Sequence, residues 1–130
     1  MKSRRQSAIL TAAILALIIV GLGINVTIHR VKLSVSLGDG GNPQMLRMIR
    51  LHGNAIEYLP LAVVLMALYE INGGWRTALH IIGIALVAGR LLQTWAMWST
   101  EVPGAGRGIG QTLTWLSIAA LAVLNLAKIM

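Results

Sequence analysis

Four long apolar segments, separated by short turns, limit what this chain can fold into more than any other feature of its sequence. They cover about residues 7–32, 43–71, 75–99 and 107–129. Each reaches the roughly 20 residues that a helix needs to cross about 30 Å of hydrocarbon. Because backbone polar groups must be paired inside a bilayer, and because the segments lack the alternation of barrel strands, we predict helices. The expected fold is all-α: an integral membrane bundle of four transmembrane helices, with residues 1–130 as a single domain.

The breaks between these segments consist of residues that end helices and form turns. Residues 37–43 are Leu-Gly-Asp-Gly-Gly-Asn-Pro, residues 72–74 are Asn-Gly-Gly, and residues 101–106 are Glu-Val-Pro-Gly-Ala-Gly. Connections this short join helices that pack antiparallel. Trp75 and Trp98, at opposite ends of the third segment, are expected to lie at the two membrane interfaces.

The first apolar segment follows a basic start, as the core of a secretory signal does. The run from Ala8 to Val26 is longer than the roughly 7–15 residues of a signal core, and no clear small-x-small cleavage site ends it. We therefore predict that it is retained as the first helix.

Composition excludes several classes of site. The chain contains no cysteine, which rules out a disulfide framework, a thiolate zinc site and a cysteine nucleophile. No two of its three histidines have metal-ligand spacing on one helical face, so no metal site is expected. The net charge of +7 comes from basic residues scattered between and within the apolar segments. This scatter favours anionic lipid or an anionic small ligand over nucleic acid.

A polar stripe within the second segment is the strongest functional signal. Arg47, Arg50, Asn54 and Glu57 follow one another at spacings of three, four and three, which places them on one helical face. A charge in mid-bilayer costs from about 3 to more than 10 kcal/mol. We therefore predict that this stripe faces a protein interior or a wet cavity. Pro60 is expected to kink the helix beside it.

Three further arginines lie within or beside apolar segments. Arg90 is far inside the third, and Glu57 is its candidate ion-pair partner because the other acids lie near loops. Arg30 lies near the end of the first segment, and Arg107 opens the fourth after a glycine-rich stretch. Structural interpretations remain open here: Glu57 and Arg90 could only hold helices together, and Arg30 and Arg107 could only bind lipid headgroups.

The segment Arg50-Leu-His-Gly-Asn54-Ala-Ile-Glu57-Tyr58-Leu-Pro60 resembles the signature of the MAPEG family, the membrane-associated proteins of eicosanoid and glutathione metabolism. In this family R-x-x-x-N-x-x-E-x-x-P lies in the second hydrophobic segment. The Leu-Gly-Asp-Gly-Gly loop before it is similar to the bacterial branch, and the layout corresponds over nearly the whole chain. The resemblance implies a multi-pass protein of a bacterial inner membrane, assembled as a homotrimer, with glutathione bound between neighbouring subunits.

The same resemblance implies roles for individual residues. Expected glutathione-binding residues are Arg50, Asn54, Glu57, Tyr58, Arg90 and Gln93, with Arg30 contributed by the first helix of a neighbouring subunit. Arg107 is expected near the thiol as the catalytic residue. The sequence departs from the family at Gln93 and Met97, where members often have His or Tyr and then Tyr.

The function implied is that of a glutathione transferase or peroxidase, with glutathione as co-substrate and a lipophilic electrophile as second substrate. A free thiol has a pKa of about 8.5, so a nearby cation such as Arg107 would increase the share of reactive thiolate. Two alternatives stand beside this one. The chain could be a non-catalytic membrane protein that binds glutathione or anionic lipid, or a subunit of a small anion transporter.

Overall fold

The computed structural model describes residues 6–99 and 104–130, and over these ranges it contains four helices and no strand. They are α1 (Gln6–Leu33), α2 (Pro43–Ile71), α3 (Arg76–Ser99) and α4 (Ala105–Ile129). Each is long and apolar enough to cross a membrane. The prediction of an all-α fold with four membrane-spanning helices is therefore confirmed.

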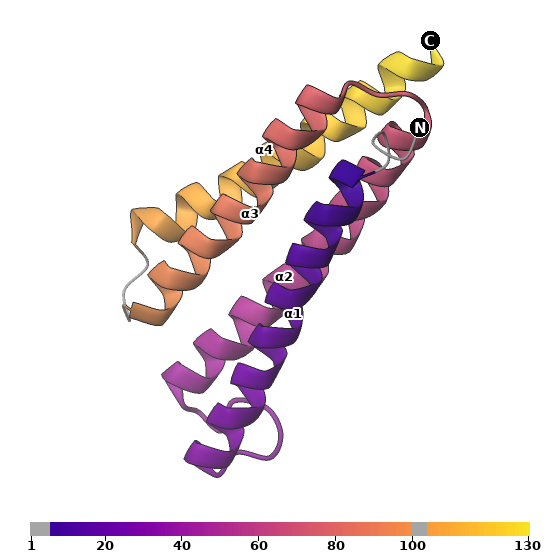
Figure 1. Ribbon diagram of the computed structural model, residues 1–130. Coiled ribbons are helices and arrows are strands. Elements are labelled where there is room, and N and C mark those ends of the chain that lie inside the picture. The colour runs from indigo at the N-terminus through magenta and orange to yellow at the C-terminus, as the bar shows by residue number, and fades with distance from the viewer. Residues whose placement is uncertain (1–5, 100–103) are drawn as a thin grey trace.

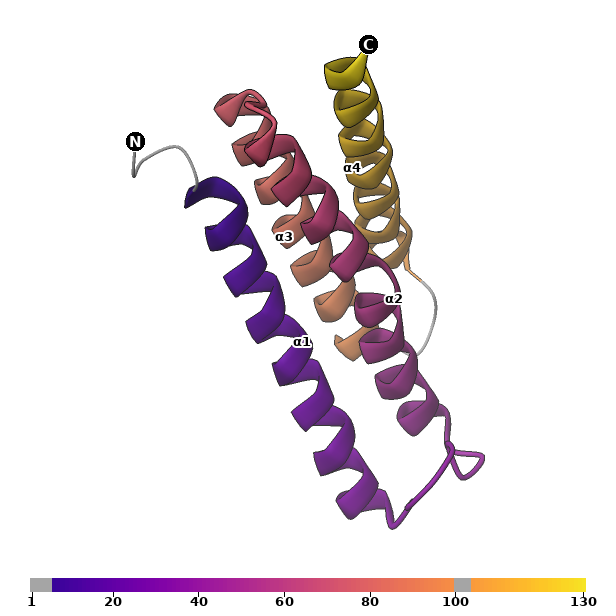
Figure 2. The same ribbon diagram turned by 90° about the vertical axis from the view of Figure 1, so that its right-hand side faces the viewer.

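Successive helices run antiparallel. α1 lies beside α2, and α3 lies beside α4, in the most extensive of the interhelical contacts (Figure 1). α4 also contacts α2, so the two pairs form one bundle (Figure 2). The loop between α1 and α2, residues 34–42, lies at one end of this bundle, which we call the loop end. The start of α1, the α2–α3 turn and the end of α4 lie at the other end.

Local sequence explains where α2 begins and ends. The Asn42 side chain caps its first turn, because Oδ1 accepts hydrogen bonds from the backbone N–H groups of Gln44 (2.9 Å) and Met45 (3.1 Å). Pro43 then occupies a first-turn position that needs no N–H donor. α2 continues through Pro60 without interruption and ends before Gly73, whose φ of 72° lies in the left-handed region that terminates helices.

A carboxylate joins α2 to α1 at the end opposite the loop end. Glu70 Oε1 accepts a hydrogen bond from the Ser7 N–H at 3.1 Å, and Oε2 accepts one from the Ala8 N–H at 3.4 Å. The first N–H groups of a helix lack intrahelical partners, and negative charge is favourable beside them. Glu70 therefore caps α1 and fixes its position against the end of α2.

The core between the helices is aliphatic. α2 buries one residue every three or four positions, and the other helices face it with leucines. The fully buried side chains include Leu15, Leu59, Met66, Leu79, Leu86 and Leu121. Large apolar side chains also cover the outside of the bundle, as expected where lipid is the solvent.

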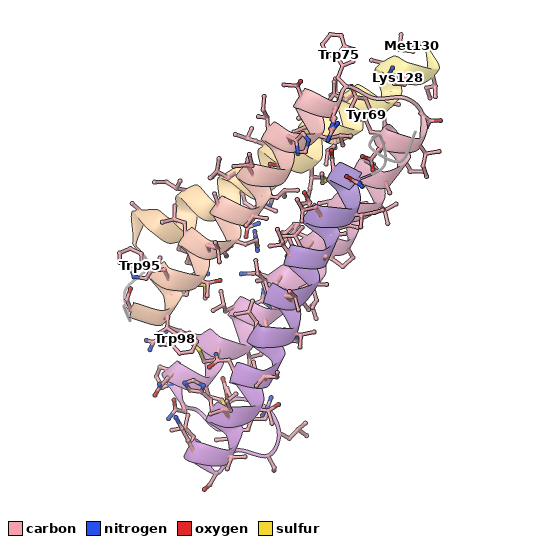
Figure 3. All side chains as sticks on the ribbon, viewed as in Figure 1. Tyr69, Trp75, Trp95, Trp98, Lys128 and Met130 are labelled. Atoms are coloured by element: carbon pink, nitrogen blue, oxygen red, sulfur yellow. The ribbon has the colours of Figure 1, made fainter. Side chains whose placement is uncertain are left out.

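Tryptophans mark the two ends of α3. Trp75 lies near Tyr69 and Lys128 at one end of α3, while Trp95 and Trp98 lie toward the other end of that helix (Figure 3). Trp75 is 74% exposed and Trp98 is 55% exposed. The structure thus places Trp75 and Trp98 at opposite ends of the helix, where amphipathic rings would contact the two interfaces.

Candidate functional site

An open cleft of about 460 Å³ lies between α2, α3 and the N-terminal half of α4. Because Gly104 and the first turn of α4 line it, the cleft is near the loop end of the bundle. Its walls are formed by Asn54, Tyr58, Gln93, Gly104, Arg107, Gly108, Gln111, Thr112 and Trp115. The cleft therefore unites four of the site residues predicted from the sequence, Asn54, Tyr58, Gln93 and Arg107, from three different helices.

Arg50 connects two other predicted residues of α2. Its Nη2 donates to Asn54 Oδ1 at 3.2 Å, and its Nη1 lies 3.4 Å from Glu57 Oε1 in an ion pair. The side chains of Arg50 and Glu57 are 50% and 47% exposed, so this pair lies on the outer surface of the bundle. The spacing of the stripe thus brings Arg50, Asn54 and Glu57 together as predicted.

The polar stripe does not line the core of the four-helix bundle. Leu51, Ala55 and Leu59 fill that position on α2. The expectation that the polar stripe faces the protein interior is therefore wrong for the single chain. The other expected setting, a polar cavity, is found at Asn54, which lines the cleft. Helical spacing shows which side chains share a face but not which neighbour covers that face.

The predicted ion pair between Glu57 and Arg90 is also wrong. Glu57 pairs with Arg50, whereas Arg90 is 2% exposed and reaches across to α4. Arg90 Nε donates to Thr114 Oγ1 at 3.0 Å, and Nη2 donates to Thr114 Oγ1 and to Gln111 Oε1. Within residues 6–99 and 104–130, no carboxylate forms an ion pair with Arg90. Neutral acceptors on α4 take the place of the acid because α3 packs closest to α4.

Thr114→Val tests this interhelical network. Valine keeps the shape of threonine but removes the acceptor for two guanidinium nitrogens, leaving a buried charge underpartnered. We expect the free energy of unfolding to fall by about 1–3 kcal/mol. Thr112→Val is the matched control, because Thr112 is exposed on the same helix. Thermal unfolding in detergent, followed by circular dichroism, measures both variants. Equal midpoints for the two would show that Thr114 contributes nothing through Arg90.

Arg30 and Arg107, the remaining two predicted site residues, lie in different places relative to the cleft. Arg30 does not line the cleft: its Nη1 donates to the backbone carbonyls of Gly38 (2.8 Å) and Val35 (3.4 Å), and so holds the loop against α1. Its role in a neighbouring subunit's site stays a prediction. Arg107 is exposed, lies in the first turn of α4 and lines the cleft.

Similarity to known proteins extends over the four helices and the cleft. The model of the MAPEG family matches residues 8–127, which include nearly all of α1–α4 and every residue that lines the cleft. The chain belongs to the MAPEG family. It is also similar to "Inner membrane protein YecN" from Escherichia coli strain K12, with 36% identity over 117 residues. That match covers 90% of this chain and 88% of the relative.

The protein of the same name from Escherichia coli O6:H1 strain CFT073 matches with the same identity and coverage. With four candidate spans in its described residues, this MAPEG protein is a multi-pass protein of the inner membrane. The resemblance and the localisation inferred from the sequence are both confirmed.

Several cleft residues of this MAPEG protein were not identified from the sequence. They lie on α4, at Gln111, Thr112 and Trp115, and the Trp115 ring contacts Tyr58 edge-to-face with centroids 6.5 Å apart. A helical periodicity in the sequence would have revealed two of them, Gln111 and Trp115. Arg107, Gln111 and Trp115 recur every four residues and so share one helical face. By contrast Met97, one of the positions where this chain departs from the family, is buried in the core.

Proposed function

We propose that this protein is a membrane-bound glutathione-dependent transferase or peroxidase, and that glutathione binds in the cleft between α2, α3 and α4. The observation that carries the proposal is the convergence of Asn54, Tyr58, Gln93 and Arg107 on one open cleft. Its volume of about 460 Å³ lies in the range of roughly 300–1,000 Å³ typical of small-molecule sites. Membership of the MAPEG family supports the choice of ligand.

The charges beside the cleft suit a zwitterionic tripeptide. Glutathione carries two carboxylates and one ammonium group. The planar guanidinium of Arg50 can bind a carboxylate through two parallel hydrogen bonds, and Glu57 can accept the ammonium. The Arg50–Glu57 pair is long at 3.4 Å and half exposed, so exchanging it for ligand contacts costs little.

Arg107 is the residue that activates the thiol. Its guanidinium and the N-terminus of α4 both contribute positive charge at the cleft, which stabilises a thiolate. The thiolate then attacks an electrophilic carbon, forming a carbon–sulfur bond while the leaving group departs with its bonding electrons. Trp115 is 54% exposed and lines the same cleft, so an apolar substrate can approach from the bilayer.

Homotrimer formation is part of the proposal. Arg50 and Glu57 lie on the outer surface of one subunit, on a helix that crosses the membrane. Charges facing lipid at this depth are costly, and a neighbouring subunit would cover them. Arg30 of that neighbour would then reach the site. Native mass spectrometry of the detergent-solubilised protein tests this: a monomer at all concentrations would contradict it.

Titration with glutathione, followed by the ultraviolet absorbance of thiolate, tests the function. The unmodified protein should give a signal that saturates. Arg50→Ala should raise the Kd for glutathione about tenfold or more without changing the final signal, because a charge-assisted contact is lost. Arg76→Ala, an arginine at the opposite end of the bundle, is the control and should leave the Kd unchanged.

Absence of both binding and thiolate in the unmodified protein would overturn the glutathione proposal. Binding without thiolate would instead support the non-catalytic alternative. An anion flux into liposomes that stops in Arg50→Ala would support the transporter.

A further inference from the structure

The amides of Gln93 on α3 and Gln111 on α4 meet at the cleft. Gln93 Nε2 donates to Gln111 Oε1 at 3.3 Å, and Arg90 Nη2 donates to the same oxygen at 3.3 Å. Gln93 is 1% exposed although it lines the cleft. Among the residues that the structure describes, Gln93 Oε1 and Gln111 Nε2 are buried without a hydrogen-bond partner. The pair thus retains one unused acceptor and one unused donor.

Arg90 determines the orientation of both amides. A guanidinium has only donors, so the Gln111 atom that faces it must be the oxygen. Gln93 meets that same oxygen and must therefore present its nitrogen. Turning either amide over would oppose two donors or two acceptors. Arg90 consequently leaves Gln111 Nε2 as the free donor and Gln93 Oε1 as the free acceptor.

A buried polar atom without a hydrogen-bond partner destabilises the protein, and a ligand that supplies the missing partner removes that cost. The free donor of Gln111 and the free acceptor of Gln93 together match the C=O and N–H groups of a peptide backbone. In an extended chain, the N–H and C=O of a single residue point to the same side, as they do in strand pairing. The last torsion of a glutamine side chain is soft, so a small rotation brings each atom to a ligand in the cleft.

We propose that Gln93 and Gln111, oriented by Arg90, recognise the backbone N–H and C=O of one residue of the bound thiol ligand. Gln93 Oε1 accepts a ligand N–H, and Gln111 Nε2 donates to a ligand C=O. This inference rests on the proposed glutathione function and deepens it. The site selects a thiol carried on a peptide over a simple thiol, because a ligand without an amide leaves both buried atoms unpartnered.

A cycle of changes on protein and ligand tests the proposal. The ligands are glutathione and two analogues in which an ester oxygen replaces one or the other peptide N–H. The variant is Gln93→Met, which removes the acceptor at similar volume and leaves Gln111 Oε1 bonded to Arg90. The control is Gln44→Met, the same substitution on an exposed side chain. Calorimetric titration in detergent gives each Kd.

In the unmodified protein and in Gln44→Met, one of the two analogues should bind about tenfold more weakly than glutathione. In Gln93→Met, that analogue and glutathione should have the same Kd, because this variant lacks the acceptor Oε1 with either ligand. An analogue that loses the same affinity in Gln93→Met as in the unmodified protein would overturn the proposal, and so would two analogues that lose none. In either case glutathione still binds, so the proposed function stands. No binding of glutathione by the unmodified protein would overturn both.

Discussion

Arg107→Ala will abolish the thiolate signal of bound glutathione while leaving most of the binding affinity. Arg107 is exposed in the first turn of α4 and lines the cleft, whereas the contacts proposed for the ligand's charged ends come from α2. Loss of its charge therefore removes stabilisation of the sulfur anion and spares the anchoring contacts. Losing one such electrostatic group typically reduces turnover by about 10²- to 10³-fold.

Three measurements check this expectation: the Kd for glutathione by calorimetry, the final thiolate absorbance, and the rate with a lipophilic electrophile. Arg107→Lys retains a cation and should retain part of the thiolate signal. Arg76→Ala should behave as the unmodified protein does. A full thiolate signal in Arg107→Ala would show that the anion is stabilised elsewhere, and the catalytic assignment of Arg107 would be wrong.

Gly110→Ala will strongly destabilise the bundle. A Cβ atom at Gly110 would overlap the carbonyl oxygen of Gly89, and it would lie 2.8 Å from Gln93 Cβ and 3.0 Å from Gln93 N. Two of these neighbours are backbone atoms of α3, so no side-chain rotation relieves the overlap. The two helices must separate, and we expect a loss of about 3 kcal/mol, the upper end for overpacking.

Gly108→Ala is the matched control, because a Cβ atom there would meet nothing within 4 Å. In a helix, alanine is favoured over glycine by about 0.5–1 kcal/mol, so this variant should be as stable as the unmodified protein or slightly more so. Thermal unfolding in detergent compares the two. Equal midpoints would mean that α3 and α4 do not approach each other as closely as described.

Gly110→Ala should also weaken glutathione binding. Moving α4 away from α3 separates Gln111 from Gln93 and Thr114 from Arg90, so the amide pair beside the cleft loses its orientation. Stability and affinity should therefore fall together in this variant. In Thr114→Val, which leaves the Gln93–Gln111 contact in place, the loss should be mainly one of stability.

The sequence by itself determined the properties that depend on a single helix: where each helix lies in the chain and which residues share one of its faces. Segment length and hydropathy are enough for four spanning helices, because the bilayer admits no unpaired backbone. The spacing of Arg50, Asn54 and Glu57 is enough to place them on one face, because helical geometry relates residues three and four apart. The same motif was sufficient to indicate the MAPEG family.

Only the tertiary structure decided which residues of neighbouring helices meet, because this depends on how one helix is rotated against another. The sequence pointed to Glu57 as the partner of Arg90, yet Arg90 turns to Thr114 and Gln111 because α3 and α4 approach closely at Gly89 and Gly110. That approach also brings Gln111 against Gln93 at the cleft. The spacing of residues along a helix carries no information about which neighbour a face meets, since the packing of side chains from all the helices sets that choice.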